Sequence, residues 1–307
     1  KSGTAAIADG EYGTTITTTN SGSNWNVISA GTTNPLYSIK FFDLNTGFIS
    51  GDFGTILKTT NAGANWIEQS TNSFSVLQDI EIVSENILYV AGDGGTILKT
   101  TDGGTNWITL NTNIFDWLHA IEFISTDVGY ASGYYGALIK TTDGGTTWET
   151  LNSGTNTILQ DLFFLDANIG FAVGGDDYGG AGTILKTTDA GTTWVLKYSE
   201  AEQMIRSIFF IDSNVGIAVG GLNTGTGSKI LRTIDAGETW IEISNDTDNN
   251  LYSVHFPSST VGYAVGFNGT ILRTTDAGLT WVILISSCTN NNLYSTYFTT
   301  DYYGYVV

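Results

Sequence analysis

The stretch Thr141-Thr142-Asp143-Gly144-Gly145-Thr146-Thr147-Trp148 decides the fold, because the chain repeats it. The same eight-residue frame ends at seven tryptophans: Trp25, Trp66, Trp107, Trp148, Trp194, Trp240 and Trp281. The spacings between successive tryptophans are 41, 41, 41, 46, 46 and 41 residues. A period near 40 residues indicates a repeat architecture, in which each repeat is one supersecondary unit.

Each copy of the frame predicts a tight turn between two strands. Its third residue carries a side-chain oxygen that can accept hydrogen bonds from backbone N–H groups further along the chain. The seven residues at this position are Asn20, Asn61, Asp102, Asp143, Asp189, Asp235 and Asp276. Glycine follows two positions later in every copy, where we expect a backbone with positive φ. One molecule has no need for the same catalytic group in seven repeats, and two of the seven are amides, so these residues are interpreted as structural.

Each full repeat divides into four strand-like runs, which in the second repeat are residues 37–42, 47–50, 55–60 and 65–69. The first run is apolar on both faces in several repeats, as in 162–165 and 208–211, which predicts strands covered on both sides. The pattern predicts an all-β, seven-bladed β-propeller of four-stranded antiparallel blades, with one such turn in each blade. Residues 1–307 are then a single domain, with blade repeats ending near the seven tryptophans.

The two ends of the chain are expected to close the ring. Residues 4–28 supply the second, third and outer strands of the first blade, and an inner strand at 293–299 completes it. Gly304-Val307 resembles another second strand and duplicates Ala5-Asp9, so the sequence leaves open which of the two is paired. We also expect the natural chain to continue beyond Val307.

The repeated frame, S/T-x-D-x-G-x-[T/N]-W, resembles the Asp-box (BNR-type) repeat of sialidases, sortilin-type receptors and xyloglucanases. The longer frame adds Leu-x-x-Ile-x-Phe, Gly-Tyr/Phe-x-x-Gly and Gly-Thr-Ile-Leu-Lys-Thr-Thr before the box, and it is most similar to the photosystem II stability/assembly-factor-like propellers. This resemblance covers essentially the whole chain and implies the propeller fold. Many unrelated activities use such a scaffold, so the resemblance says little about function.

Charge and composition exclude several classes of partner. Thirty acidic residues face eleven basic ones, for a net charge of −19, so binding to nucleic acid is not expected. Without a run of 18 apolar residues, membrane insertion is not expected either. The excess of Thr, Asn, Ser and Gly favours a secreted or cell-surface protein, and a place as one module of a longer surface protein stays open. The single Cys288 excludes an internal disulfide, and no cofactor or metal site is expected.

The candidate ligand face is the one opposite the Asp-boxes. The second residue of each inner strand is expected to enter the central mouth there, and these seven residues are Tyr37, Gln78, His119, Gln160, Arg206, Tyr252 and Tyr294. Such an aromatic and amide-rich ring suits stacking on sugars or holding a peptide. The alternative is that it only fills and solvates a narrow channel. Beside the ring, Phe115 and Trp117 form an aromatic cluster, and Asp176, Asp177 and Tyr178 lie in an inserted loop.

We therefore expect a non-catalytic binding or scaffolding propeller whose partner is a protein or a glycan. The alternative is a glycoside hydrolase of sialidase-like or xyloglucanase-like type. A sialidase needs three arginines around its substrate carboxylate, but two of the three arginines here, Arg232 and Arg273, belong to a periodic basic series in the third strands. A xyloglucanase-like enzyme needs paired carboxylates in a cleft, and Asp79, Asp116 and Asp161 on this face show no distinctive arrangement.

Overall fold

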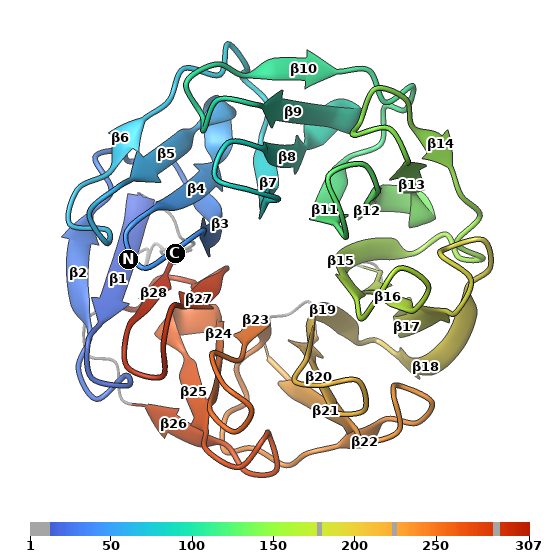
Figure 1. Ribbon diagram of the computed structural model, residues 1–307. Coiled ribbons are helices and arrows are strands. Elements are labelled where there is room, and N and C mark those ends of the chain that lie inside the picture. Colours follow the sequence, from blue (N-terminus) through green and yellow to red (C-terminus); the bar gives the residue numbers. More distant parts are fainter. Residues whose placement is uncertain (1–12, 177–179, 223–225, 285–288) are drawn as a thin grey trace, which may run out of the picture.

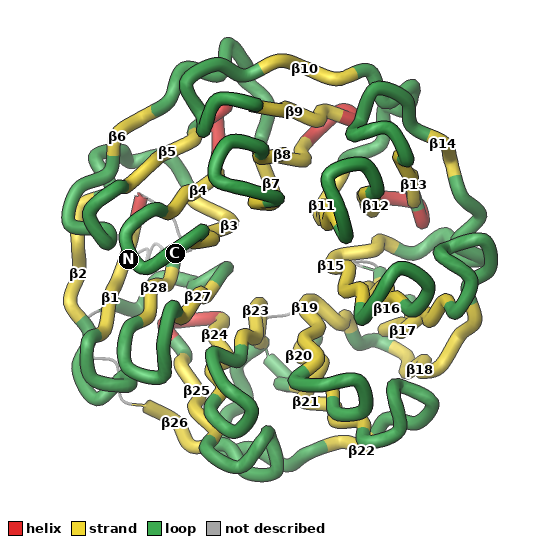
Figure 2. The backbone as a smooth tube through the Cα atoms, viewed as in Figure 1, coloured by secondary structure: helices red, strands yellow, loops and turns green. Residues whose placement is uncertain are grey.

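The computed structural model describes residues 13–176, 180–222, 226–284 and 289–307. The regular structure of these residues consists of strands, with no α-helix (Figure 2). Short 3-10 turns follow four of the strands: η2 (Asp52–Gly54), η3 (Asp93–Gly95), η4 (Tyr134–Gly136) and η5 (Phe267–Gly269). The predicted all-β class is thereby confirmed.

Five of the sheets in the described ranges are antiparallel and four-stranded, as predicted. Two of them are β3 (Leu36–Phe41), β4 (Gly47–Gly51), β5 (Ile56–Thr59), β6 (Ile67–Glu68), and β7 (Leu77–Ile82), β8 (Leu88–Gly92), β9 (Thr96–Thr100), β10 (Ile108–Leu110). Two more are β11 (Leu118–Phe123), β12 (Gly129–Gly133), β13 (Leu138–Thr141), β14 (Glu149–Thr150), and β23 (Leu251–His255), β24 (Gly262–Gly266), β25 (Ile271–Thr274), β26 (Val282–Leu284). These four sheets stand radially around a centre, with the first strand of each nearest to it (Figure 1).

A larger sheet holds two successive antiparallel meanders. Its strands are β15 (Ile158–Phe164), β16 (Gly170–Gly175), β17 (Ala181–Thr187), β18 (Val195–Ala201), β19 (Met204–Phe210), β20 (Gly216–Gly221), β21 (Lys229–Thr233) and β22 (Ile241–Glu242). The meanders β15–β18 and β19–β22 are joined by one bridging pair between β16 and β19, Gly175 with Met204. They repeat the four-strand pattern of the other sheets.

The remaining four-stranded sheet combines the two ends of the described chain. Its order is β2 (Asn26–Ser29), β1 (Thr14–Thr18), β28 (Gly304–Val306), β27 (Thr296–Phe298). The antiparallel register places Ile16 opposite Val306 and Thr18 opposite Gly304. The C-terminal segment is therefore the one that pairs with β1, which corrects the expectation that residues 4–28 supply this second strand. Ala5-Asp9 lies outside the described residues.

The Asp-box turns form for the reasons expected from their residues. In the copy between β13 and β14, Asp143 Oδ1 accepts hydrogen bonds from Thr147 N (2.8 Å) and Thr141 Oγ1 (2.9 Å). Gly145 N donates to Thr141 Oγ1 at 2.9 Å. The box glycines all have positive φ, between 72° and 91°: Gly22, Gly63, Gly104, Gly145, Gly191, Gly237 and Gly278. The turn is thus held by its own side chains, as expected for a structural element.

We expect Gly145→Val to lower the free energy of unfolding by at least about 1–3 kcal/mol, because a β-branched residue is strained at positive φ. Gly145 has a φ of +85°, and an added Cβ would lie 2.7 Å from Leu110 Cδ1. Urea denaturation measures the loss. Gly154→Val is the comparison that isolates the backbone strain, because Gly154 has a φ of +75° with nothing within 4 Å, so the loss there should be smaller only by the steric contact with Leu110. If Gly145→Val unfolds at the wild-type urea midpoint, the strain argument is wrong.

The apolar core lies between adjacent sheets. An aromatic residue of one second strand stacks on a phenylalanine of the next inner strand, with ring centroids 3.5 to 4.4 Å apart. The pairs are Tyr89 with Phe123, Tyr130 with Phe164, Phe171 with Phe210, Tyr263 with Phe298, and Tyr305 with Phe41. Each stacked pair removes a large apolar area from water, so the packing of neighbouring sheets supplies most of the stability.

The periodic basic residues of the third strands also link neighbouring sheets. Lys58 Nζ donates to Gly103 O at 2.7 Å and Lys99 Nζ donates to Gly144 O at 2.7 Å, each in the next Asp-box. The same ammonium groups lie 5.4 Å from the Phe48 ring centroid and 5.2 Å from that of Tyr89. The series therefore has a structural role, with its stems on apolar surface and its cations on backbone carbonyls.

Candidate functional site

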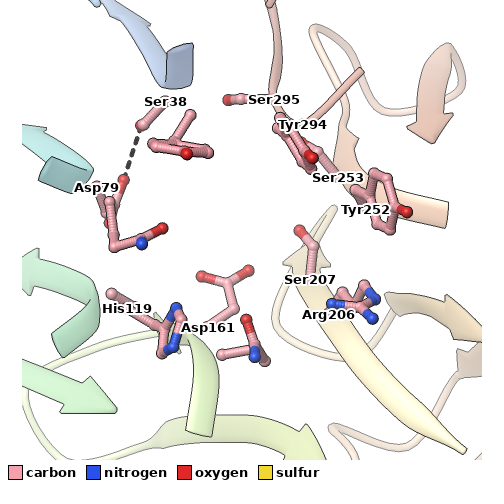
Figure 3. A pocket seen from close by; sticks show the side chains of 14 residues that line it. Ser38, Asp79, His119, Asp161, Arg206, Ser207, Tyr252, Ser253, Tyr294 and Ser295 are labelled. Carbon is pink, nitrogen blue, oxygen red and sulfur yellow. Dashed lines mark hydrogen bonds between the residues drawn. The ribbon is translucent and has the colours of Figure 1, made fainter. Parts of the chain in front are cut away.

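A cavity of about 170 Å³ lies at the centre of the ring of sheets, between the beginnings of the inner strands (Figure 3). All seven residues predicted for the central mouth line it: Tyr37, Gln78, His119, Gln160, Arg206, Tyr252 and Tyr294. We call these residues the mouth ring. The residues that follow them in sequence line the same cavity: Ser38, Asp79, Ala120, Asp161, Ser207, Ser253 and Ser295. The second residues of the inner strands therefore meet at one cavity, and their binding role is taken up below as a proposal.

One side of the mouth ring is aromatic. Tyr294 stacks on Tyr252 with ring centroids 5.3 Å apart and contacts Tyr37 at 5.5 Å. The Arg206 guanidinium lies 5.1 Å from the centroid of the Tyr252 ring. On the other side, burial and the nearby Arg206 charge lower the pKa of His119 to about 4, so its imidazole is neutral at pH 7. The ring thus offers π faces and neutral polar groups to a ligand.

A belt of hydrogen bonds, which the sequence did not reveal, runs just inside the mouth ring. In six places among the described residues, a Ser or Asp side chain of one inner strand accepts the backbone N–H of the next inner strand. The pairs are Ile80 N to Ser38 Oγ (3.4 Å), Ile121 N to Asp79 Oδ2 (3.0 Å), Ile208 N to Asp161 Oδ2 (2.9 Å), Val254 N to Ser207 Oγ (3.3 Å), Thr296 N to Ser253 Oγ (3.2 Å) and Ile39 N to Ser295 Oγ (3.3 Å). We call this set the belt.

The belt gives the two mouth carboxylates a structural role. Asp79 also accepts the Ser38 hydroxyl at 2.8 Å, the contact drawn in Figure 3. The other oxygen of Asp161, Oδ1, accepts Leu162 N at 2.9 Å. Leu162 N lies opposite Ala120, the one belt position whose side chain has no polar atom to accept it. Burial, followed by the nearby charge of Asp79, raises the pKa of Asp161 to about 7. Both carboxylates are therefore committed to backbone donors rather than presented as a free acid–base pair.

A second cavity of about 280 Å³ lies deeper in the same channel and shares Ser38, Asp79, Asp161 and three further serines of the belt with the first. Its charged lining adds Lys40, Glu81 and Glu122. Lys40 Nζ lies 2.7 Å from Glu81 Oε2 and 3.7 Å from Asp79 Oδ1, and these carboxylates raise its pKa although burial opposes them. The channel therefore continues inward as a charged compartment.

The predicted aromatic cluster lies beside the mouth rather than inside it. Trp117 is 47% exposed and meets Tyr134 edge to face at 5.4 Å, and Tyr134 stacks on His119 at 5.1 Å. Phe115 is 89% exposed. Tyr134 connects the cluster to the mouth ring, and neither the box pattern nor the inner-strand pattern points to it. Together these residues form one aromatic surface from the channel outward.

Three further exposed aromatics were missed by the sequence analysis. Phe53 and Tyr135 are 66% and 74% exposed, and both have positive φ (54° and 55°) at the place where the third repeat has Gly94. Phe74, 88% exposed, lies in the loop that contacts the Phe53 turn, since Gly54 N donates to Ser75 O at 2.8 Å. Aromatic residues at left-handed positions are strained and exposed at once, which indicates a surface role. Aligning the repeats at Gly94 would have found Phe53 and Tyr135.

The inserted loop contributes little to the described site. Asp176 is half-buried and does not line the mouth cavity, and Asp177 and Tyr178 lie outside the described residues. Within the described ranges, no group of three or more His, Cys, Asp or Glu side chains is arranged to hold a metal ion. The same part of the chain contains no helix with the length and apolar character needed to cross a membrane.

Comparison with known proteins agrees with this geometry. A family model for photosynthesis system II assembly factor YCF48 matches residues 16–114. The solved structure "YCF48 bound to D1 peptide" matches with a TM-score of 0.73 at 18% identity, over 92% of this chain and 96% of that one. The structure of YCF48 from Cyanidioschyzon merolae matches with a TM-score of 0.69 at 18% identity, over 88% of this chain and 92% of that one. The GH74 enzyme of Niastella koreensis matches with a TM-score of 0.65 at 17% identity, over 82% of this chain and 45% of the enzyme. No curated protein matches the chain.

The class that fold and repeats define is the BNR-type β-propeller. Within that class the chain resembles the photosystem II assembly factor YCF48, as its repeats predicted.

The predicted secreted or cell-surface location is wrong. The matching family and two of the similar structures are a photosystem II assembly factor, not a secreted or surface protein. The composition misled because much of the Thr and Gly builds the repeated turn. In one copy, for example, Thr141, Gly145 and Thr147 each make a hydrogen bond of the Asp-box. The high content of Thr and Gly therefore reflects the repeated turn and does not indicate where the protein is located.

Proposed function

We propose that this chain is a non-catalytic, seven-bladed propeller that binds a protein partner through the mouth face, opposite the Asp-boxes. The blade count takes the meanders β15–β18 and β19–β22 as two blades, and the β27–β28–β1–β2 sheet as the blade that joins the chain ends. The belt supports a closed ring of residues 1–307, because Ile39 N on β3 donates to Ser295 Oγ beside β27.

The observation that carries the binding proposal is the exposed aromatic surface at the mouth. Phe115 and Trp117 leave large apolar areas in water, and Tyr134 continues them to His119 of the mouth ring, which also holds Tyr252, Tyr294 and Tyr37. Aromatic side chains of this kind anchor peptides because they bury much area at little cost in side-chain entropy. The similar YCF48 structure is described as bound to a D1 peptide, which supports a peptide as the ligand.

A glycan is the second candidate, since tyrosine and tryptophan faces also stack on sugars. The glycosidase alternative is weaker, although GH74 enzymes share the fold. Asp79 and Asp161 are held by backbone N–H donors of neighbouring strands, and a retaining or inverting mechanism needs one free acid and one free base.

We expect Trp117→Ala to weaken binding of peptides selected on the wild-type protein at least about tenfold, because truncating a central aromatic anchor commonly costs 2 kcal/mol or more. The peptides come from a displayed library of random twelve-residue sequences, and fluorescence anisotropy measures their affinity. Tyr302→Ala is the control, because Tyr302 is also exposed but lies in the loop between β27 and β28, away from the mouth.

The selection itself tests the function. A wild-type protein that enriches no peptide, or that binds a glycan array and no peptide, contradicts a protein-binding role. Equal loss of affinity in Trp117→Ala and Tyr302→Ala places the binding surface elsewhere.

A further inference from the structure

The two central cavities hold an uneven set of charges. Their carboxylates are Asp79, Glu81, Glu122 and Asp161, and their cationic side chains are Lys40 and Arg206. Both histidines of the channel are neutral at pH 7, because burial first, with cationic neighbours second, lowers the pKa of His119 and of His255 to about 4. The two cavities therefore hold four carboxyl groups but two cationic side chains, so carboxyl groups are in excess.

We propose that the channel below the mouth ring receives a lysine or arginine side chain of the bound peptide, whose cationic end pairs with Glu122 across from Lys40. This inference rests on the proposed function and adds the chemistry of the partner. It commits the surface to a peptide with a basic residue at its anchoring position.

Lys40 shows what this compartment does with an ammonium group. From β3, its Nζ approaches two carboxylates of the neighbouring β7, Glu81 at 2.7 Å and Asp79 at 3.7 Å. These two ion pairs account for one side of the channel. On the next strands around the ring, β11 and β15, the carboxyl groups of Glu122 and Asp161 line the same cavity, and no ion pair involves either of them in the described part of the chain.

Glu122 is the carboxyl group with an unused oxygen. Its Oε1 accepts Phe164 N at 3.0 Å, whereas its Oε2 is buried and has no hydrogen-bond partner among the described residues. A buried polar atom without a partner is destabilising, so it favours a ligand that donates to it. Burial raises the pKa of Glu122 well above its usual range, and a cation beside Oε2 would stabilise the charged form that burial disfavours.

The path to Glu122 fits a long basic side chain. The mouth cavity and the deeper cavity share Asp79 and Asp161, so a stem that passes the mouth ring reaches the deeper one. Tyrosine faces at the entrance attract cations, as the Arg206 guanidinium on Tyr252 illustrates. The net charge of −19 also steers basic partners toward the molecule and repels acidic ones.

Two measurements test the partner chemistry, and the first is the composition of the selected peptides. We expect the twelve-residue library to yield peptides that share one Lys or Arg. Replacing that residue by norleucine, which keeps the stem and removes the charge, should weaken binding at least tenfold. Selected peptides that have no shared basic residue, or that bind equally well with norleucine, overturn the inference while the proposed peptide-binding function stands. No selected peptide at all refutes both.

The second measurement locates the charge. Glu122→Gln keeps the oxygen that accepts Phe164 N and removes the negative charge, so we expect a folded protein that binds the basic peptide at least about fivefold more weakly. The matched control is Glu149→Gln on the exposed outer strand β14, which should bind as the wild type does. The norleucine peptide should not distinguish Glu122→Gln from the wild type. Equal affinity of both variants for the basic peptide removes Glu122 from the site and overturns the inference.

Discussion

Gly133→Ala lowers the free energy of unfolding by about 2–4 kcal/mol, although alanine adds a single methyl group. Gly133 ends β12 with an extended backbone, so the obstacle is steric and not conformational. A Cβ at this position would lie 1.8 Å from Trp117 O and 2.9 Å from Leu118 Cα. The Tyr134 N–H donates to the same Trp117 carbonyl at 2.9 Å, so moving the strands apart breaks this bond too. Overpacking and the lost hydrogen bond together account for the expected cost.

Urea denaturation measures this loss, and Gly94→Ala separates its cause. Gly94 has a φ of +65° and nothing within 4 Å of an added Cβ, so alanine there meets only backbone strain of about 1 kcal/mol. Because Gly133 abuts the backbone of Trp117, the damaged variant should also lose peptide binding. A Gly133→Ala protein as stable as Gly94→Ala contradicts the close approach of the two strands.

The same close approach recurs around the molecule, and this explains why the sequence predicted the sheets so well. A glycine at the end of the second strand, or one residue before it, would place a Cβ 1.8 to 2.2 Å from an inner-strand or preceding carbonyl in six repeats: Gly51, Gly92, Gly133, Gly174, Gly220 and Gly266. Box residues and strand-ending glycines act within one repeat, between residues close in sequence. Local rules of turn chemistry and alternation therefore suffice to predict them.

The belt could not be predicted in this way. Its bonds join residues 42 to 47 positions apart, or 256 for Ile39 and Ser295, so they depend on the register between neighbouring sheets. The sequence placed Asp79 and Asp161 at the mouth as possible glycosidase acids, and only the structure shows their backbone donors. The pairing of β28 with β1 is non-local in the same sense, and two similar segments competed for that place.

Local rules of turn chemistry also fail to predict Phe53 and Tyr135, which have positive φ although they are not glycines. Turn preferences predict glycine at their left-handed positions, as the third repeat has at Gly94. A large aromatic side chain there violates the local preference and is exposed as well. Such departures are expected where a surface serves binding rather than stability, which agrees with their place on the mouth face.

Asp161→Ala should remove about 2–4 kcal/mol of stability, since it leaves two backbone donors, Leu162 N and Ile208 N, without their shared acceptor. The control is Ser253→Ala, which frees Thr296 N from a 3.2 Å bond and should cost about 1 kcal/mol. Chemical denaturation of the two variants at pH 6 compares them. If both variants lose the same small amount, the Asp161 carboxyl is not a double acceptor of the belt.

The raised pKa of Asp161 makes the free energy of unfolding depend on pH, with stability falling as the pH rises. Its folded-state value of about 7 lies above the ordinary value, so the folded protein retains a proton that the unfolded chain releases. This contribution to stability is complete below about pH 4 and is lost as the pH rises through 7. Glu122, with its raised pKa, acts in the same direction, whereas the neutral His119 and His255, with pKa values near 4, contribute stability that is lost as the pH falls from 6.5 through 4.

The clean window for Asp161 is therefore pH 6.5 to 8, above the histidine range. There the wild-type protein should become less stable by up to about 0.8 kcal/mol, because the larger part of the linkage between pH 4 and 7 lies below this window. Asp161→Asn has no proton to lose at this position, so its stability should change less over the same interval, even though it starts lower for want of one acceptor. Parallel slopes for the two proteins would show that the pKa of Asp161 is not raised, and with it that the belt holds this carboxyl in its charged form.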